Sequence, residues 1–374
     1  MTTALFFERL QAHFERKLPF VVYRKPNENT IYSILQNSDE LFYANDFTEK
    51  GFVFSPFDDI DKTILMPLEA CDIISLDNFH FTNEESGGIS LLKDIEEKEQ
   101  QHHITIVKKG VKEIKKGILR KVVLSRKEVH ELINPNPFTI FKKLLSTYVK
   151  GFVYCWYHPK VGLWLGATPE TLIKIENQKF SVMALAGTQQ YKGEENVVWQ
   201  NKEIEEQQYV TDFITENIKT SVINISVSNS ETVKSGNLLH LKSTITGTLN
   251  LKDINLKQFL EKLHPTPAVC GVPKPDAKVF ILKNENYNRE FYTGFLGELN
   301  FEMYRQPRSG KRNIEPRTCS VQKYTTQLYV NLRCMQLKGG NAIIYVGGGI
   351  TKLSNAESEW EETVSKSMII KTVL

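Results

Sequence analysis

Short runs of β-branched and aromatic residues, each bounded by Gly, Pro or Asn, dominate the chain from about residue 119 onward. Examples are RKVVLSRK, GFVYCWYH, GLWLGA, TLIKIE and FSVMALAG. This pattern is typical of short strands joined by turns. Because long helical crossovers do not separate the runs regularly, we predict an α+β fold with large antiparallel sheets and not a doubly wound fold.

Helical periodicity appears in four places. Residues 1–20 form an amphipathic stretch, and a second helix is indicated where apolar residues recur at intervals of four, three and four. A third is predicted over about 195–218, and a fourth begins at the capping-box pair Ser354 and Glu357 and runs to about Ile370. The apolar residues of the second helix are Val107, Val111, Ile114 and Ile118. The polar, Gly-ended segment 78–88 between the first two helices is predicted to be a loop.

Composition narrows the class of protein. A chain of 374 residues forms one large or two modest domains, and its net charge of +3 is too small to imply nucleic acid as the main ligand. Five cysteines without a CxxC pair argue against a disulfide framework or a zinc site and suit a reducing cytosol. No apolar run approaches the roughly 18 residues of a membrane span. The start of the chain carries Glu8 and Glu15 and does not resemble a signal peptide. We therefore expect a cytoplasmic protein.

Lys121 lies in the predicted strand RKVVLSRK. Alternation places it on the same face as Leu119 and Val123, so its neighbours on that face are apolar. A desolvated lysine favours its neutral form, which suits a general base near pH 7. An edge-strand lysine whose ammonium group reaches back to water fits the same pattern.

Glu170 ends the segment GATPE, in which Gly166 and Pro169 mark a turn after a strand. Functional groups often project from such turns. A solvated turn glutamate is the alternative interpretation.

Carboxylates recur on two of the predicted helices. Glu206 lies four residues before Val210 and so points to an apolar face, whereas Glu359, Glu362 and Lys366 share one face of the last helix. Carboxylates from two helices can hold a hard cation that takes oxygen ligands, and Mg²⁺ fits because the sequence shows no His/Cys cluster. Ordinary surface pairing of glutamate-rich helices is the alternative.

Arg333 lies within the predicted strand LYVNLRCMQL, and Tyr345 with glycines 347–349 lies in the strand-like run that follows a GGN turn. A charge in mid-strand needs an anionic partner, and a glycine run lets backbone N–H groups approach a carboxylate. A tight turn that holds no ligand explains the glycines equally well.

His264 lies in the segment LHPTPAVCGVP, where prolines make the loop rigid. Its imidazole either hydrogen-bonds a substrate or caps the loop.

Nine blocks, taken in order, resemble the signature of the chorismate-binding enzymes. That family includes isochorismate synthases, salicylate synthases, anthranilate synthase large subunits and aminodeoxychorismate synthases. The resemblance implies a catalytic domain over 105–374, a variable segment over 1–100 packed on the same core, and sheets packed as a two-subdomain sandwich with flanking helices. The blocks are KVVLSR, GATPE, ALAGT, the Glu206 helix, HPTPAVCG, NREFYTGFLGE, the LRC strand, YVGGGI and SEWEET.

The resemblance also implies roles for single residues. Lys121 corresponds to the base that activates water, and Glu170 to the acid that protonates the departing hydroxyl. Glu206 and Glu362 match the Mg²⁺ ligands, and Glu359 is their neighbour around the metal. The positions that match groups around the substrate are Gly187, Thr188, His264, Arg333, Tyr345, Gly348, Gly349 and Lys366.

Two positions separate reactions within the family. Enzymes that add ammonia typically lack a lysine at position 121, and common aminodeoxychorismate synthases carry a lysine where Ala186 stands. The resemblance therefore implies water as the nucleophile, which leaves isochorismate synthase or salicylate synthase, and the length of the chain is close to that of the shorter isochorismate synthases. We expect a monomer that needs no glutaminase subunit and hydrates chorismate at C2 with loss of the C4 hydroxyl, for menaquinone or siderophore synthesis.

The chain departs from its family in two places. Ile204 and Gln207 stand where many relatives carry an arginine and a histidine beside the metal-binding glutamate. The basic stretch 304–327 replaces a short hairpin, and we expect a solvated loop there, with a partner or anion site as the alternative.

Overall fold

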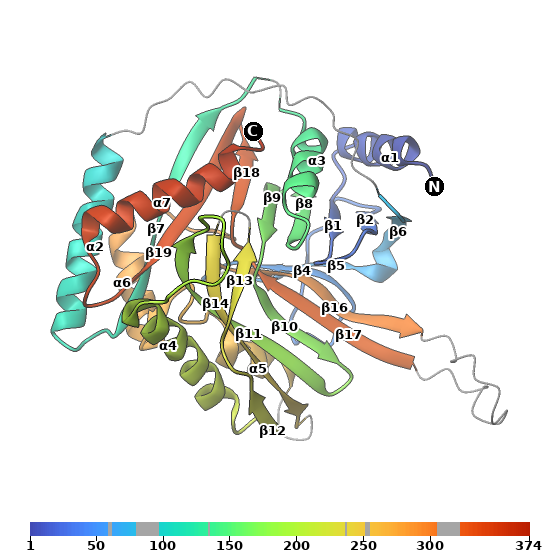
Figure 1. Ribbon diagram of the computed structural model, residues 1–374. Helices are drawn as coiled ribbons and strands as arrows, with labels where there is room; N and C mark the ends of the chain where they lie inside the picture. The colour runs from blue at the N-terminus through green and yellow to red at the C-terminus, as the bar shows by residue number, and fades with distance from the viewer. Residues whose placement is uncertain (59–61, 80–96, 134, 236–237, 251–254, 305–321) are drawn as a thin grey trace.

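Two large antiparallel sheets form the body of the protein in the computed structural model, which describes residues 1–58, 62–79, 97–133, 135–235, 238–250, 255–304 and 322–374 (Figure 1). The first sheet contains, in spatial order, β15 (Gly271–Val272), β7 (Lys121–Glu131), β19 (Asn341–Ile350), β18 (Cys334–Lys338), β9 (Gly162–Thr168), β8 (Phe152–His158), β1 (Phe20–Arg24), β2 (Ile31–Gln36) and β6 (Cys71–Leu76).

The second sheet has ten strands and a similar hairpin-rich order. It contains β12 (Val222–Val227), β14 (Leu238–Leu249), β11 (Lys179–Gln190), β10 (Thr171–Glu176), β17 (Gln322–Val330), β16 (Phe295–Tyr304), β4 (Gly51–Ser55), β5 (Ile64–Pro67) and β3 (Phe42–Tyr43), while β13 (Glu231–Ser235) pairs with β14. Each described pairing in both sheets is antiparallel, for example β7 with β19 and β11 with β14. The predicted α+β class with large antiparallel sheets is therefore confirmed.

Helices cover the outer faces of both sheets (Figure 1). Apolar residues of α1 (Thr3–Glu15) and α3 (Pro137–Thr147) pack on the first sheet, and those of α4 (Asn201–Ile218) and α5 (Leu256–Leu263) pack on the second. A further cluster joins β7 to α2 (Glu97–Lys115), α6 (Lys274–Asn284) and the first turns of α7 (Ala356–Lys371). A short 3₁₀ turn, η1 (Leu68–Ala70), connects β5 to β6. None of the described helices is long and apolar enough to cross a membrane.

The inner faces of the two sheets meet in a core rich in aromatic rings. Phe54 of β4 lies 5.0 Å from Trp156 and 4.3 Å from Phe291, measured between ring centroids, and all three rings are buried. Edge-to-face and stacked rings of this kind add to the free energy of burying their apolar area. This core holds the two sheets in a fixed relation, which matters because the candidate residues are distributed over both.

The N-terminal segment supplies strands to both sheets. β1, β2 and β6 extend the first sheet beyond β8, and β3, β4 and β5 extend the second beyond β16. Neither sheet marks a boundary near residue 100, so the division into 1–100 and 105–374 stays a prediction. Most of the predicted loop 78–88 and residues 305–321 of the basic stretch lie outside the described residues, while residues 322–327 belong to β17.

Several local expectations need correction. The third predicted helix begins at Asn201 and not near 195. The last helix is capped by Asn355 and not by Ser354, because the Asn355 side chain accepts a hydrogen bond from Ser358 N at 2.9 Å. Arg333 precedes β18 with a φ of 47° and is not a mid-strand residue. The glycine run lies inside β19 and forms no turn. The error at the last helix arises because asparagine and serine are equally good helix caps, and Ser354 and Asn355 are adjacent in the sequence.

We predict that Phe54→Ala lowers the free energy of unfolding by about 3–5 kcal/mol, because the cavity left between the sheets cannot collapse. Urea unfolding followed by tryptophan fluorescence measures this change. The matched apolar control is Val279→Ala on α6, whose side chain is 65% exposed and whose loss should change the stability by less than about 0.5 kcal/mol. Equal stability of the two variants would contradict the assignment of Phe54 to the core between the sheets.

Candidate active site

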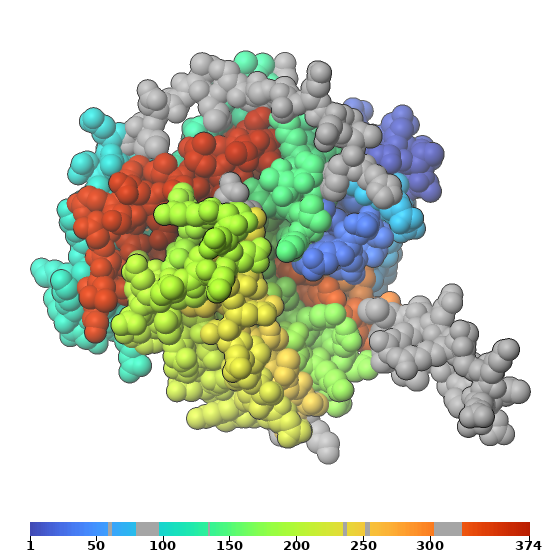
Figure 2. Space-filling view, in the orientation of Figure 1, coloured from blue at the N-terminus to red at the C-terminus, as the bar shows by residue number. Residues whose placement is uncertain are grey.

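One cavity among the described residues gathers most of the candidate side chains. It has about 850 Å³ of empty volume, part of it open to solvent, a size that suits a small organic ligand. Both sheets contribute to its wall, together with α4 through Glu206 and α7 through Glu362 and Lys366. In Figure 2 the red atoms of α7 lie next to the yellow-green atoms of α4. The lining residues are Val123, Pro169, Glu170, Leu185, Ala186, Gly187, Thr188, Glu206, Leu238, His240, Ala268, Val269, Tyr292, Thr293, Leu332, Arg333, Tyr345, Val346, Gly347, Gly348, Gly349, Glu362 and Lys366.

Lys121 forms an ion pair with Glu206 at the cavity wall. Its Nζ lies 2.8 Å from Glu206 Oε1, and the lysine side chain is fully buried behind the glutamate and does not itself line the cavity. This burial excludes the alternative of a lysine that reaches back to water. Burial raises the pKa of Glu206, but the ammonium groups of Lys121, Lys366 and Lys202 outweigh that effect and hold the pKa below its ordinary value.

Gly349 makes this ion pair possible. A Cβ at position 349 would lie 2.3 Å from Glu206 Oε1 and 3.0 Å from Lys121 Cε, so any side chain would push the glutamate away. At the neighbouring Gly348 a Cβ would meet Glu359 Oε2 at 3.5 Å, which is an ordinary contact. The glycine run therefore gives room to the acidic groups of α4 and α7 and does not serve as a turn.

Glu170 occupies the turn between β9 and β10 and is 3% exposed, so it is not the solvated turn residue of the alternative interpretation. Its backbone N–H donates to Thr168 Oγ1 at 3.2 Å, and its carbonyl accepts from Val330 N at 3.1 Å. Burial raises the pKa of Glu170 to about 8, although Lys121 acts in the opposite direction. The carboxyl group is therefore protonated at neutral pH and can donate a proton into the cavity.

Each of the three candidate metal ligands has its own lysine. Besides the Glu206 pair, Glu359 lies 2.8 Å from Lys202, and Glu362 lies 2.7 Å from Lys366. These pairs neutralise a dense group of acids from α4 and α7. Among the described residues, no three His, Cys, Asp or Glu side chains are already grouped closely enough to hold a metal ion.

The donor chemistry nevertheless fits a hard cation. Glu359 Oε2 is buried and has no hydrogen-bond partner, and burial and the neighbouring Glu362 raise the pKa of Glu359 despite the contact with Lys202. A carboxylate oxygen left unpaired in a buried position is costly unless a ligand completes it. An all-oxygen set of this kind suits Mg²⁺ better than a thiophilic metal.

A buried histidine orients Arg333. His240 Nε2 lies 3.0 Å from Arg333 Nη2, and His240 Nδ1 lies 3.0 Å from the carbonyl oxygen of Gly187. Burial and the guanidinium lower the pKa of His240 to about 3, so the ring is neutral at pH 7. In the tautomer that satisfies both contacts, Nδ1–H donates to Gly187 O and Nε2 accepts from Arg333. Burial lowers the pKa of Arg333 to about 10, which leaves it cationic at neutral pH.

His240 is the main cavity residue that sequence reasoning did not single out. It stands in the run LLHLKSTITG, where a lone histidine among strand residues gives no chemical signal. Only the pairing of β14 with β11 carries its ring to Gly187 and Thr188, and Thr188 Oγ1 lies 3.3 Å from His240 Nδ1.

Aromatic rings form another part of the wall. Tyr345 is buried and stacks between Trp164 and Tyr292, with its ring centroid 5.3 Å from that of Trp164 and 5.5 Å from that of Tyr292.

Gly187 lies where β11 passes close to α4. It has a φ of 71°, and a Cβ there would lie 3.0 Å from Glu203 Cβ, so the close approach of β11 and α4 requires glycine.

His264 does not reach this cavity. Its ring is buried against Phe295 and lines a separate cavity beside Ala44, Phe47 and Leu260, so the expectation that it faces the substrate is not met. Phe295 of β16 and residues of α5 line this second cavity with His264. Ala268 and Val269, from the same loop as His264, line the first cavity. The loop is shared between two cavities, which its sequence does not show.

The two departures beside Glu206 have separate explanations. Ile204 is 48% exposed on the outer side of α4. Gln207 is buried and its Nε2 donates to Thr211 Oγ1 and Ser243 Oγ, both at 2.9 Å, so it joins α4 to β14. Neither residue lines the cavity, and the position of Glu206 does not depend on the usual arginine and histidine.

Comparisons with known proteins bear on the family of the chain. Two family models match the chain, "Chorismate binding enzyme" over residues 54–304 and "chorismate binding enzyme" over residues 320–372. The isochorismate synthase MenF of Escherichia coli (strain K12) is 24% identical over 72% of this chain and 59% of its own length. The isochorismate synthase DhbC of Bacillus subtilis (strain 168) is 26% identical over 73% of this chain and 71% of its own length. The matches to three MenF relatives span only 57–60% of their lengths.

Solved structures of similar fold cover nearly the whole chain. The structure of Escherichia coli MenF aligns with a TM-score of 0.77 and 19% identity, covering 95% of this chain and 88% of that one. Anthranilate synthase component I from Streptococcus pneumoniae aligns with a TM-score of 0.66 and 18% identity, covering 94% and 92%. These TM-scores establish a common fold, and identities this low establish nothing more.

We predict that Glu170 makes stability depend on pH. Its folded-state pKa lies above the ordinary value, so the folded chain holds an extra proton between about pH 4.5 and pH 8, and the stability that this proton contributes is lost as the pH rises through that window. Glu170→Gln cannot ionise, so its free energy of unfolding should rise relative to wild type between about pH 5 and pH 8. Urea unfolding at each pH measures the difference. The exposed control Glu216→Gln should show no such trend, and a constant offset for Glu170→Gln would contradict the prediction.

Proposed function

The chain belongs to the chorismate-binding enzymes, and from this premise we propose that it interconverts chorismate and isochorismate by adding water at C2 and releasing the C4 hydroxyl. The observation that carries the proposal is the meeting of a protonated carboxyl group, Glu170, with the ion pair of Glu206 and the buried Lys121 at the wall of one cavity. This exchange of hydroxyl groups needs one group that donates a proton and another that accepts one.

Cationic groups in the wall suit a doubly negative substrate. Arg333 and Lys366 both line the cavity, and Arg333 is held in place by neutral His240, which accepts a hydrogen bond and adds no charge. Guanidinium and carboxylate pair well in a desolvated site. Lys366 also donates to the carbonyl of Gly347 at 3.0 Å, which fixes its ammonium group beside β19. We propose that these two cations hold the carboxylates of chorismate.

The proton transfers follow from the two buried groups. In the proposed reaction, Lys121 acts after its ammonium group has given up a proton: the free amine takes a proton from the attacking water, and the water oxygen bonds to C2. Glu170 gives its proton to the C4 hydroxyl, which leaves as water while the ring double bonds shift. The new ammonium group of Lys121 lies beside Glu206, whose negative charge stabilises it. The cycle closes when Glu170 regains a proton and Lys121 loses one, so the reaction runs in both directions.

We propose that Glu206, Glu359 and Glu362 hold Mg²⁺. The unpaired Oε2 of Glu359 and the space left by Gly348 support this assignment. A bound divalent ion would supply positive charge against a substrate carboxylate among these acids.

Water, not ammonia, is the proposed nucleophile. Ala186 is buried in the cavity wall, at the position where aminodeoxychorismate synthases of the common type carry a lysine, and Lys121 stands where ammonia-adding relatives typically have none. Because water serves as the nucleophile, we expect no glutaminase subunit. Relatives named isochorismate synthase agree with this choice.

The direct test is product analysis. Incubation of the purified chain with chorismate and Mg²⁺, without ammonia, should yield isochorismate on chromatography, and isochorismate should return chorismate. Lys121→Ala should lose activity by at least about 10²-fold because the proposed base is removed, while Arg333 and Lys366 should still bind chorismate in calorimetry. The exposed control Lys109→Ala should keep wild-type activity. Salicylate with pyruvate, or anthranilate only after ammonia is added, would replace the proposed reaction by another of the same family.

Removal of divalent ions should abolish the conversion of chorismate to isochorismate, and added Mg²⁺ should restore this activity. Glu362→Gln should weaken Mg²⁺ binding measured by calorimetry by at least about tenfold, because one charged ligand is lost. The neighbouring Glu361→Gln is the control, since that side chain is exposed and should leave Mg²⁺ binding unchanged. Full turnover in the presence of a chelator would refute the metal assignment.

A further inference from the structure

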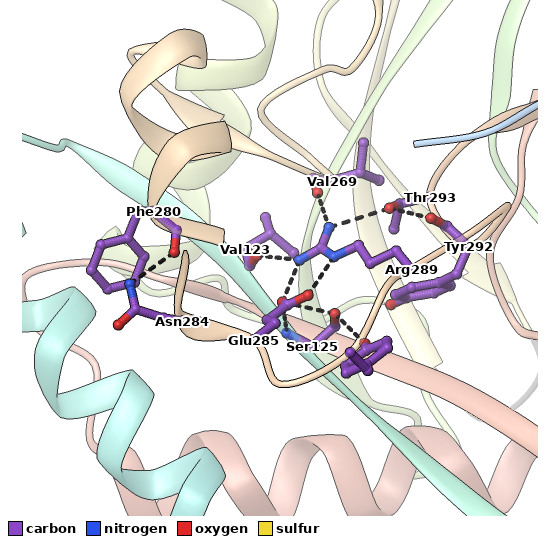
Figure 3. A network of polar contacts seen from close by, with 10 residues as sticks. Val123, Ser125, Val269, Phe280, Asn284, Glu285, Arg289, Tyr292 and Thr293 are labelled. Atoms are coloured by element: carbon purple, nitrogen blue, oxygen red, sulfur yellow. Dashed lines mark hydrogen bonds and ion pairs between the residues drawn. The ribbon is translucent and has the colours of Figure 1, made fainter. Parts of the chain in front are cut away.

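Beyond the end of the short strand β15, side chains form the hydrogen bonds to the backbone edge of β7, the strand that carries Lys121. β15 pairs with β7 only at Lys121 and Val122, and Val123 N donates to the carbonyl of Cys270 at 2.7 Å. Beyond that point, Val123 O accepts from Arg289 Nη2 at 2.8 Å, and Ser125 N donates to Glu285 Oε1 at 2.7 Å (Figure 3). An ion pair thus takes the place of the next strand.

Arg289 uses all of its hydrogen-bonding directions. Its Nε donates to Glu285 Oε2 at 2.8 Å and its Nη2 to Glu285 Oε1 at 2.6 Å, which makes a bidentate pair. Its Nη1 donates to Val269 O at 3.0 Å and to Thr293 Oγ1 at 3.2 Å. Arg289 and Glu285 are 2% and 8% exposed, so the guanidinium has no access to solvent and a fixed position.

The groups that Arg289 holds belong to three separate parts of the cavity wall. Val123 comes from β7, Val269 from the loop before β15, and Thr293 from the loop before β16, and all three line the cavity. Arg289 and Glu285 do not line it themselves, and the proposed mechanism assigns them no role. Figure 3 shows the guanidinium at the centre of these contacts.

Glu285 extends the network toward the aromatic wall. Its Oε1 also accepts from Ser125 Oγ at 2.8 Å, and Ser125 Oγ lies 2.6 Å from Tyr287 Oη. The ring of Tyr287 lies 6.0 Å from that of Tyr345, which faces the cavity. The same carboxylate therefore contacts the strand that carries Lys121 and, through Ser125, the tyrosines.

We infer that Arg289 and Glu285 are positioning residues that fix the strand of Lys121 against the loops of the cavity wall. A buried ion pair contributes little net stability compared with apolar residues of similar size, so stability alone does not account for it. The planar guanidinium supplies a rigid connection between three segments of the chain, through two backbone carbonyls and one hydroxyl, which an apolar side chain cannot provide. The inference rests on the proposed function only in that Lys121 is the group being positioned.

The test compares kcat, KM and stability in two variants. Arg289→Lys keeps the charge but cannot reach Val123 O, Val269 O and Glu285 together, so kcat should fall about 10- to 100-fold, with KM within about threefold of wild type, at temperatures well below unfolding. Ser125→Ala removes only the hydroxyl contacts with Glu285 and Tyr287 and should fold even if Arg289→Lys does not. It should lower kcat by about three- to tenfold.

The matched control is Ser33→Ala. Ser33 is equally buried in the first sheet and its Oγ donates to Val21 O at 3.0 Å, away from the cavity, so kcat should stay within about twofold of wild type. Wild-type kcat in folded Ser125→Ala and Arg289→Lys, or an equal loss in Ser33→Ala, would overturn the inference. The proposed function fails separately, if wild-type enzyme in the same assay turns chorismate into a product other than isochorismate or into none.

Discussion

The buried contact between Lys121 and Glu206 is the interaction on which the rest of the site depends. It joins a strand of the first sheet to a helix on the second, at the wall of a cavity that both sheets line. A single lysine buried there would be costly, and so would a single glutamate, so each permits the other. Gly349 is needed because the carboxylate occupies the space that a side chain would fill. The aromatic core between the sheets keeps the two partners at this distance.

Charge compensation explains how so many ionisable groups occupy one small volume. The acids of α7 form ion pairs with lysines, and Arg333 contacts a histidine that stays neutral. Glu170 carries no charge because its raised pKa keeps it protonated. The site thus contains groups in opposite protonation states without a large uncompensated charge. Such an arrangement is suited to a doubly negative substrate, because binding brings new negative charge to a place that already has ammonium and guanidinium groups.

Positional precision comes from a different network. The carbonyls and hydroxyl bound by Arg289 lie on segments far apart in the sequence, and they meet only at the cavity wall. Glu285 neutralises the guanidinium and completes the open edge of β7. Chemistry and positioning are therefore divided between two buried charge networks, one facing the cavity and one behind its wall.

The sequence by itself determined the α+β class, most of the strands, and the identity of Lys121, Glu170, Glu206, Arg333 and Tyr345 as candidates. Period-two alternation and ordered motifs are local properties, and they can be recognised without knowing what packs against them. The tertiary structure alone decided which candidates meet. It brought His240 to Arg333, placed His264 in another cavity, and moved Arg333 from a strand to the residue before one. It also decided that Glu170 is protonated, because burial and the charges of distant segments set a pKa, and neither is written in the neighbouring residues.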